Sequence, residues 1–137
     1  MMKAKRYTLV ISRLRAAGVR PTKQRIALGL MLFHGENQHF TAYNLFCEAS
    51  KTGVKVSLAT VYNTLDEFTA VGLLREVVVD SSRRYFDTNV LEHQHFFFED
   101  RNELVDINMG DAVLFQFPSI PAGKTIRCVD VIVRVSG

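Results

Sequence analysis

The residues best suited to chemistry in this chain are histidines with carboxylates nearby. His93 and His95 are separated by one residue, so on a β-strand both imidazoles face the same side and can reach one metal ion. Asp87 precedes the pair, and Asp106 lies on the strand expected to pair with it. His39 comes from the turn before the third expected helix. Imidazole nitrogens combined with carboxylate oxygens suit Fe²⁺ or Mn²⁺ better than a thiolate-rich zinc site would.

These candidate ligands come from both halves of the chain. An ion held by side chains of both halves would fix their relative orientation, and a small binding event would then act as a switch. We therefore expect a regulatory metal site. The alternative is that the histidines are solvated surface groups without an effector.

Charge is distributed unevenly along the chain. Residues 1–85 carry 13 Lys and Arg against 6 Asp and Glu, whereas residues 86–137 carry 4 against 8. A basic first part followed by an acidic part suggests that only the first part meets a polyanion such as DNA.

Other composition features predict a cytoplasmic protein with no membrane partner. No apolar run approaches the roughly 20 residues of a membrane span, and no signal segment follows the basic start. Cys47 and Cys128 belong to no C-x-x-C pair, which favours free thiols in a reducing compartment.

The first half of the chain predicts four helices. Apolar residues recur at helical spacing from Tyr7 to Ala17 and in three later segments. The expected N-caps of the later helices are Thr22, Thr41 and Ser57, and the glycines expected to end three of the helices are Gly18, Gly53 and Gly72. The fourth helix carries small and polar residues on its exposed face, with Tyr62 at the edge of that face. Such a surface can enter a major groove closely.

After Gly72 the hydrophobic period changes to two. Residues 74–79 and 83–88 are predicted strands, joined by a turn at residues 80–82. Helices followed by a hairpin of this kind indicate a winged helix, and Arg83 and Arg84 near the hairpin tip are natural phosphate contacts.

The remaining chain predicts a second, smaller unit. Residues 90–99 and 103–107 are expected to pair as strands, 110–117 to form a short helix, 118–123 a linker and 125–135 a long strand. Three strands and a short helix form a hydrophobic core that is too small for the unit to be stable by itself. The expected fold class is α+β, with a winged-helix DNA-binding domain at 1–88 and a small α/β domain at 89–137 for homodimerisation and sensing.

Three stretches resemble the ferric uptake regulator superfamily. They are GVRPTKQR at Gly18–Arg25, SLATVYNTL at Ser57–Leu65 and GLL at Gly72–Leu74. The resemblance implies a cytoplasmic homodimer that represses transcription from inverted-repeat DNA, here expected to be A·T-rich. By matching position, Tyr62 would contact bases, Ser57 and Thr60 would lie near backbone or bases, and Arg20 would enter the minor groove. The superfamily's regulatory metal site maps onto the residues His39, Asp87, His93, His95 and Asp106.

Within that superfamily, the runs Tyr85–Asn89, His93–His95 and Glu103–Ile107 are most similar to the iron response regulator branch of alphaproteobacteria. That branch implies regulation of iron and haem homeostasis, with haem delivered by ferrochelatase. Neither cysteine precedes a proline, so haem would use His93 and His95. Phe98 and Arg101 stand where most members carry a C-x-x-C pair, so no structural zinc is expected.

Two other classes of protein compete with this interpretation. The spacing of His93, His95 and Glu99 satisfies the core of a cupin metal motif, which would make the chain a metal-dependent enzyme. The helical first 70 residues argue against such a barrel, and we expect no enzyme. The other competitor is a winged-helix DNA binder that responds to no effector.

Overall fold

The computed structural model describes residues 2–91, 94–107, 119–127 and 129–137. The chain divides into two compact units, residues 1–90 and 91–137, called here the N-terminal unit and the C-terminal unit. Within the described ranges, no helix is long and apolar enough to cross a membrane.

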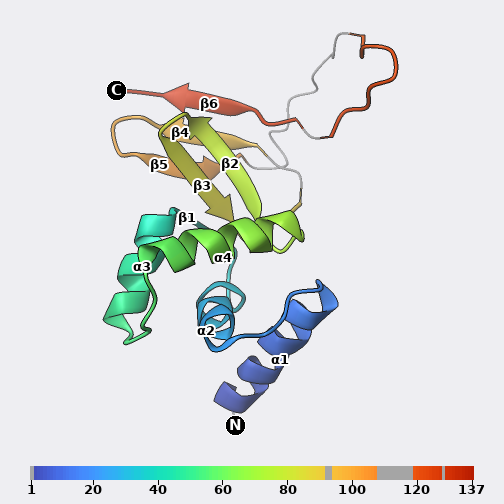
Figure 1. The fold of residues 1–137 in the computed structure, drawn as a ribbon. Helices are drawn as coiled ribbons and strands as arrows, with labels where there is room; N and C mark the ends of the chain where they lie inside the picture. The colour runs from blue at the N-terminus through green and yellow to red at the C-terminus, as the bar shows by residue number, and fades with distance from the viewer. Residues whose placement is uncertain (1, 92–93, 108–118, 128) are drawn as a thin grey trace. The chain divides into compact units, whose positions relative to one another are not determined.

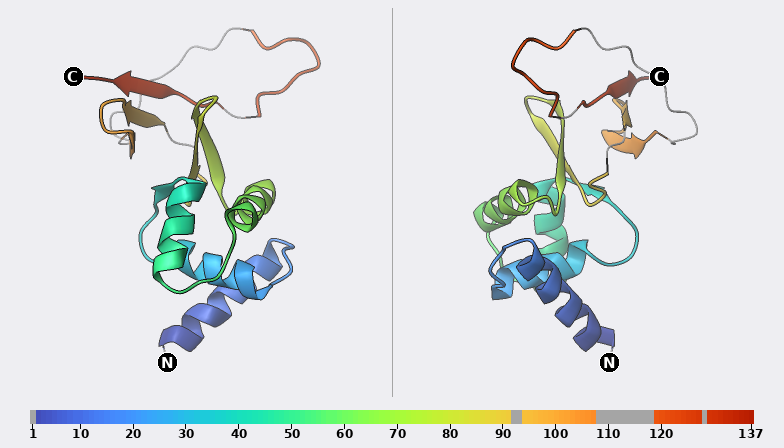
Figure 2. Two further views of the ribbon diagram at one scale, coloured as in Figure 1. Left: turned by 60° about the vertical axis from the view of Figure 1, so that its left-hand side comes forward. Right: turned by 90° about the vertical axis from the view of Figure 1, so that its right-hand side faces the viewer.

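The N-terminal unit is a winged helix preceded by an extra helix. Its elements are α1 (Met2–Ala16), α2 (Lys23–Leu32), β1 (His39–Phe40), α3 (Ala42–Lys51), α4 (Leu58–Ala70), β2 (Arg75–Asp80) and β3 (Arg83–Asp87). The three strands form one antiparallel sheet in the order β1-β3-β2. The hairpin of β2 and β3 projects away from α1 and α2 (Figures 1 and 2). The expected helices and hairpin are confirmed.

The three expected N-caps all form. The Thr22 hydroxyl accepts a hydrogen bond from the backbone N–H of Arg25 at 3.2 Å. Thr41 and Asn44 make a reciprocal capping box at the start of α3. Ser57 accepts from the backbone N–H of Thr60 at 3.0 Å. Each cap satisfies one of the backbone donors that a helix N-terminus leaves unpaired, so these polar residues define where the helices begin.

The apolar faces of the helices meet in one core beneath the hairpin. Leu14, Leu28, Leu65, Phe68 and Phe86 are fully buried. The predicted apolar stripe is confirmed in α4 and, except for the exposed Tyr7, in α1. Leu30 and Phe33, which the helical period also predicts on the inner face of α2, are only half-buried. Each large apolar side chain that is fully buried contributes about 1.5–3 kcal/mol to stability, and this burial is the main stabilising contribution in the unit.

A close approach of α1 to α2 depends on Gly29. A Cβ built at this buried glycine would lie 2.7 Å from Cγ1 of Val10. We expect Gly29→Ala to destabilise the unit, because overpacking costs typically 1–3 kcal/mol whereas the gain in helix propensity is only about 1 kcal/mol. Urea unfolding measures the difference. In a Val10→Ala background the obstructing methyl is gone, so the same substitution should become neutral or stabilising, and equal effects in both backgrounds would contradict this close approach.

The C-terminal unit contains a three-stranded sheet. Its strands are β4 (His95–Phe98), β5 (Glu103–Asp106) and β6 (Ile132–Val135). The order is β5-β4-β6, with β4 antiparallel to β5 and parallel to β6. The predicted pairing of the two strands around residues 100–102 is confirmed.

Two strand lengths expected from the sequence are wrong. The first strand begins at His95 rather than at residue 90, and the last covers only Ile132–Val135 rather than 125–135. The physical reason is that β6 pairs with β4, which has only four residues. The valines that precede Ile132 therefore have no β4 residue opposite them in the register. The helix expected at 110–117 lies outside the described residues.

Candidate metal centre and nucleic-acid interface

The N-terminal unit places a histidine opposite an aspartate across two strands. In the register of β1 and β3, His39 faces Asp87, and His39 Nε2 lies 3.3 Å from Asp87 Oδ2. The other carboxylate oxygen, Oδ1, accepts a hydrogen bond from the backbone N–H of Asn89 at 2.8 Å. Asp87 is only 1% exposed. The carboxylate is therefore oriented by its own chain, with one oxygen directed at the imidazole.

The two-residue strand β1 was not expected from the sequence, which predicted a turn up to His39. Gln38 and Thr88 bond reciprocally: the Gln38 backbone N–H donates to the Thr88 hydroxyl at 2.9 Å, and the Thr88 N–H donates to the Gln38 carbonyl at 3.1 Å. Phe40 stacks on Phe86 with ring centroids 5.9 Å apart. These interactions hold His39 beside β3.

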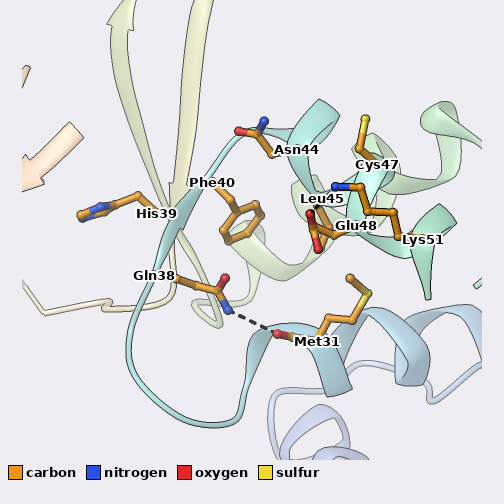
Figure 3. A pocket seen from close by; sticks show the side chains of 9 residues that line it. All are labelled: Met31, Gln38, His39, Phe40, Asn44, Leu45, Cys47, Glu48 and Lys51. Atoms are coloured by element: carbon orange, nitrogen blue, oxygen red, sulfur yellow. Dashed lines mark hydrogen bonds and ion pairs between the residues drawn. The ribbon is translucent and has the colours of Figure 1, made fainter. Parts of the chain in front are cut away.

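A surface cavity of about 550 Å³ lies on the other side of β1, between that strand and α3 (Figure 3). His39 and Phe40 leave the strand on opposite sides, as successive strand residues do, and the imidazole points away from Cys47, Glu48 and Lys51 on α3. Cys47 is a free, half-buried thiol, and a side-chain hydrogen bond with it raises the pKa of Tyr43. His39 is itself one of the residues that line the cavity, so the cavity borders the histidine–aspartate pair, with the imidazole directed toward Asp87 rather than toward α3.

The C-terminal unit repeats the same arrangement. His95 faces Asp106 across β4 and β5, and His95 Nε2 lies 3.2 Å from Asp106 Oδ1. His95 is buried, whereas the side chain of Asp106 is 44% exposed. The sequence predicted both residues and their strand pairing. His93, the other member of the predicted pair, lies outside the described residues.

Gln94 is a structural residue that sequence reasoning passed over. Its side-chain Oε1 accepts from the backbone N–H of Val131, and its Nε2 donates to the carbonyl of Val129 at 3.3 Å. Its own carbonyl accepts from the N–H of Ile107 at 2.8 Å. The Gln94 side-chain amide thus joins the segment before β6 to the start of β4. Its position between two histidines is the only signal that sequence offers for this role.

Each histidine–aspartate pair has the chemistry of half a metal site. An imidazole nitrogen and a carboxylate oxygen at about 3 Å are both ligand types for first-row divalent metals, and a nitrogen–oxygen donor set without sulfur fits Fe²⁺ or Mn²⁺. The backbone bond from Asn89 to Asp87 supplies the outer support that ligating carboxylates usually have. The residues present therefore fit the metals expected from the sequence.

The exposed part of α4 carries the predicted DNA contacts. Tyr62 is 40% exposed. Ser57 and Thr60 are engaged locally, since the Ser57 hydroxyl donates to the Thr60 hydroxyl at 2.9 Å while also capping the helix. Their first role is therefore to begin α4, and any contact to DNA would be made by hydroxyls already ordered by this cap.

The other two predicted DNA contacts lie on segments flanking α4. Arg20, in the exposed segment before α2, is tied to that region through its carbonyl, which accepts from Arg25 Nη1 at 2.8 Å. Arg25 also pairs with Glu67 of α4 at 2.6 Å. On the hairpin, Arg83 Nε lies 3.2 Å from Asp80 Oδ2. The structure thus joins the segment of Arg20 to α4, a connection that the sequence did not predict.

A winged helix with an exposed, capped fourth helix, followed by a unit whose described residues form a three-stranded sheet with a histidine–carboxylate pair, is typical of the DNA-binding transcriptional regulators that respond to metal ions. Residues 16–121 match the model of the Ferric uptake regulator family. This chain belongs to the Ferric uptake regulator family. It is therefore a transcriptional regulator and not an enzyme, which confirms the expectation from sequence and excludes the cupin alternative.

Relatives of known function and structure agree with this assignment. The chain is 34% identical over 110 residues to the peroxide-responsive repressor PerR of Staphylococcus aureus, covering 80% of this chain and 68% of PerR. Its fold is similar to that of the ferric uptake regulator of Pseudomonas aeruginosa solved with manganese, with a TM-score of 0.70, 24% identity and coverage of 92% and 96% of the two chains. The ferric uptake regulator of Francisella tularensis solved with iron gives a TM-score of 0.68 at 18% identity, covering 88% and 92%.

Proposed function

We propose that this chain is a homodimeric repressor that binds an A·T-rich inverted repeat and responds to Fe²⁺ or Mn²⁺ held by His39, Asp87, His95 and Asp106, with His93 as a further ligand. The observation that carries the proposal is the repeated pairing of histidine Nε2 with an aspartate oxygen, once in each unit. Residues 1–88 would bind DNA, and residues 89–137 would dimerise and complete the sensor.

The choice of metal is supported by the donors themselves. Four ligands of imidazole and carboxylate type lack the thiolates that select zinc. A bound divalent ion would supply positive charge to offset the two carboxylates, and the imidazoles of His39 and His95 would be its nitrogen ligands. Manganese and iron are the metals named for the solved relatives of Pseudomonas and Francisella.

The dimer is supported by the small core of the C-terminal unit. Among the described residues of that unit, the buried apolar side chains are Phe97 and Leu104, while Val133 on β6 is 39% exposed. Three strands of four residues bury too little apolar surface for independent stability. A second copy would cover that surface, and two copies of α4 would then read two half-sites.

A finer assignment is the iron response regulator branch, in which haem delivered by ferrochelatase would release the protein from DNA. This assignment rests on the sequence resemblance at Tyr85–Asn89, His93–His95 and Glu103–Ile107. Haem would need His93 or His95 as an axial ligand. The contact of His95 Nε2 with an Asp106 oxygen at 3.2 Å fits a cation held by nitrogen and oxygen ligands, and it does not by itself exclude haem. Haem is therefore tested as the competing effector.

The decisive experiment is a mobility-shift titration with a duplex that the wild-type protein selects from a randomised library. Mn²⁺, Fe²⁺ under anaerobic conditions, and haem are added separately to protein freed of metal. A change in DNA affinity of at least about tenfold with Mn²⁺ or Fe²⁺, and none with haem, supports the proposal. A response to haem alone would contradict the metal proposal and support haem as the effector. No change in DNA affinity with any of the three would mean that the protein binds DNA without responding to these effectors.

Tyr62 is expected to read sequence. Replacing Tyr62 with alanine should weaken binding to the selected duplex by on the order of 1–3 kcal/mol, because a side chain at a base edge no longer makes its specific interaction. Fluorescence anisotropy on selected and random duplexes measures the effect. Tyr62→Phe separates the hydroxyl from the ring, and an equal loss on both duplexes would show that Tyr62 contributes no sequence discrimination.

A further inference from the structure

The helix α4 carries two adjacent carboxylates, Asp66 and Glu67, although it is the helix expected to approach phosphates. Each carboxylate is paired with an arginine from a different flanking element. Arg25 of α2 reaches Glu67 at 2.6 Å, and Arg84 of β3 reaches Asp66 at 2.9 Å. The arginines neutralise charge that would repel DNA, and they connect α4 to the segment before α2 and to the hairpin.

The pairing of Arg84 is the more extensive of the two. Its Nε donates to Glu76 Oε1 at 2.7 Å and its Nη2 to Glu76 Oε2 at 3.0 Å, a bidentate pair with the neighbouring strand β2. The same Nη2 donates to Asp66 Oδ1 at 2.9 Å, and the guanidinium lies 5.2 Å from the centre of the Phe86 ring. The hydrogen bonds to Glu76 raise the pKa of Arg84 above its usual value, and the hydrogen bond to Asp66 raises it further by a smaller amount. Three of the five N–H donors of the guanidinium are thus bonded to Glu76 and Asp66 within the protein, whereas the sequence predicted a phosphate contact for Arg84.

We propose that Arg84 is a positioning residue, which holds the hairpin of β2 and β3 at a fixed angle to α4 and so sets discrimination between operator and random DNA. This inference rests on the proposed DNA-binding function. Exposed ion pairs contribute little to stability, and the side chain of Arg84 is 39% exposed. Its three directed hydrogen bonds nevertheless restrict how two DNA-facing elements are placed.

The experiment compares Arg84→Met with Arg83→Met, a control on the neighbouring residue of the same strand. Dissociation constants for the library-selected duplex and a random duplex are measured at several salt concentrations. Because Arg83 is expected to bind a phosphate, Arg83→Met should reduce the slope of log K against log salt by about 1 and weaken both duplexes equally. Arg84→Met should leave the slope unchanged and lower the ratio of operator to random affinity by about tenfold.

Two further variants keep the test independent of folding. Arg84→Lys keeps the charge but removes the planar fork, and it should lower the ratio by the same factor. Asp66→Asn removes the α4 end of the interaction, and its effect should be non-additive with that of Arg84→Met. Thermal unfolding followed by circular dichroism is expected to shift little for all of these variants.

The outcomes separate the inference from the function on which it rests. A wild-type protein that fails to prefer any duplex would overturn the proposed function itself. If the wild type is selective but Arg84→Met flattens the salt slope as Arg83→Met does, Arg84 contacts phosphate and the inference is wrong. An unchanged affinity ratio in Arg84→Lys, or additive effects of Asp66→Asn and Arg84→Met on that ratio, would also overturn it.

Discussion

Replacing Asp87 with asparagine is expected to weaken Mn²⁺ binding by more than about 100-fold. Mutation of an outer partner of a metal ligand already costs about 10–100-fold in affinity, and Asp87 is proposed as a direct ligand with one oxygen facing His39 at 3.3 Å. The substitution is nearly isosteric, and the remaining amide oxygen can still accept from the backbone N–H of Asn89. The fold should therefore persist while the anionic ligand is removed, as isothermal titration calorimetry can measure.

The same measurement decides whether the two pairs form one site. If they do, the wild type binds one Mn²⁺ per chain, and His39→Ala, Asp87→Asn, His95→Ala and Asp106→Asn each remove that binding. If each pair were an independent site, variants at His39 and Asp87 would leave binding at His95 and Asp106 intact. His34→Ala is the matched control, because His34 is an exposed histidine of the N-terminal unit outside both pairs. A wild-type response that survives Asp87→Asn would contradict the proposed centre.

The proposed binding also predicts a stability effect. A metal that binds only the folded protein stabilises it by about 2.7 kcal/mol at a free concentration 100 times its dissociation constant. Wild-type protein should therefore melt at a higher temperature with Mn²⁺, and the Asp87→Asn variant should not.

The second large effect is expected at Phe86, which joins the core to the strand pair that carries the proposed metal ligands His39 and Asp87. Phe86→Ala should reduce the free energy of unfolding of the N-terminal unit by about 3–5 kcal/mol, because a fully buried phenylalanine leaves a cavity when truncated. Most domains have only about 5–15 kcal/mol in total. Urea unfolding followed by fluorescence or circular dichroism gives the difference.

Because of its position, truncation of Phe86 is also expected to affect the proposed metal site. Phe86 is opposite Phe40 in the register of β1 and β3, and the two rings stack next to His39 and Asp87. Under conditions where the variant remains folded, Phe86→Ala should therefore also lower Mn²⁺ affinity. Phe86→Leu is the control, since a nearly filled site should lose less stability and keep β1 in place. A loss below about 1 kcal/mol in Phe86→Ala would mean that the stack contributes little.

Local sequence signals determined most of the helical unit. Thr22, Thr41 and Ser57 begin their helices as predicted, because an N-cap is satisfied by donors within three residues of itself. The turn after Asp80 also closed as expected, with the Asp80 carboxylate accepting from the N–H of Ser82 at 2.9 Å. Interactions of this range are encoded in short stretches of chain, so propensity and spacing are enough to find them.

Tertiary structure decided the features that depend on distant partners. The strand at His39 exists because β3 pairs with it 48 positions later in the chain, and β6 is short because its partner β4 is short. Arg84 became a structural residue only because Asp66 and Glu76 lie within reach of its guanidinium. Chemical types and helical periods are properties of the sequence alone, whereas which strand is opposite which, and which charge meets which, follows from packing across the whole unit.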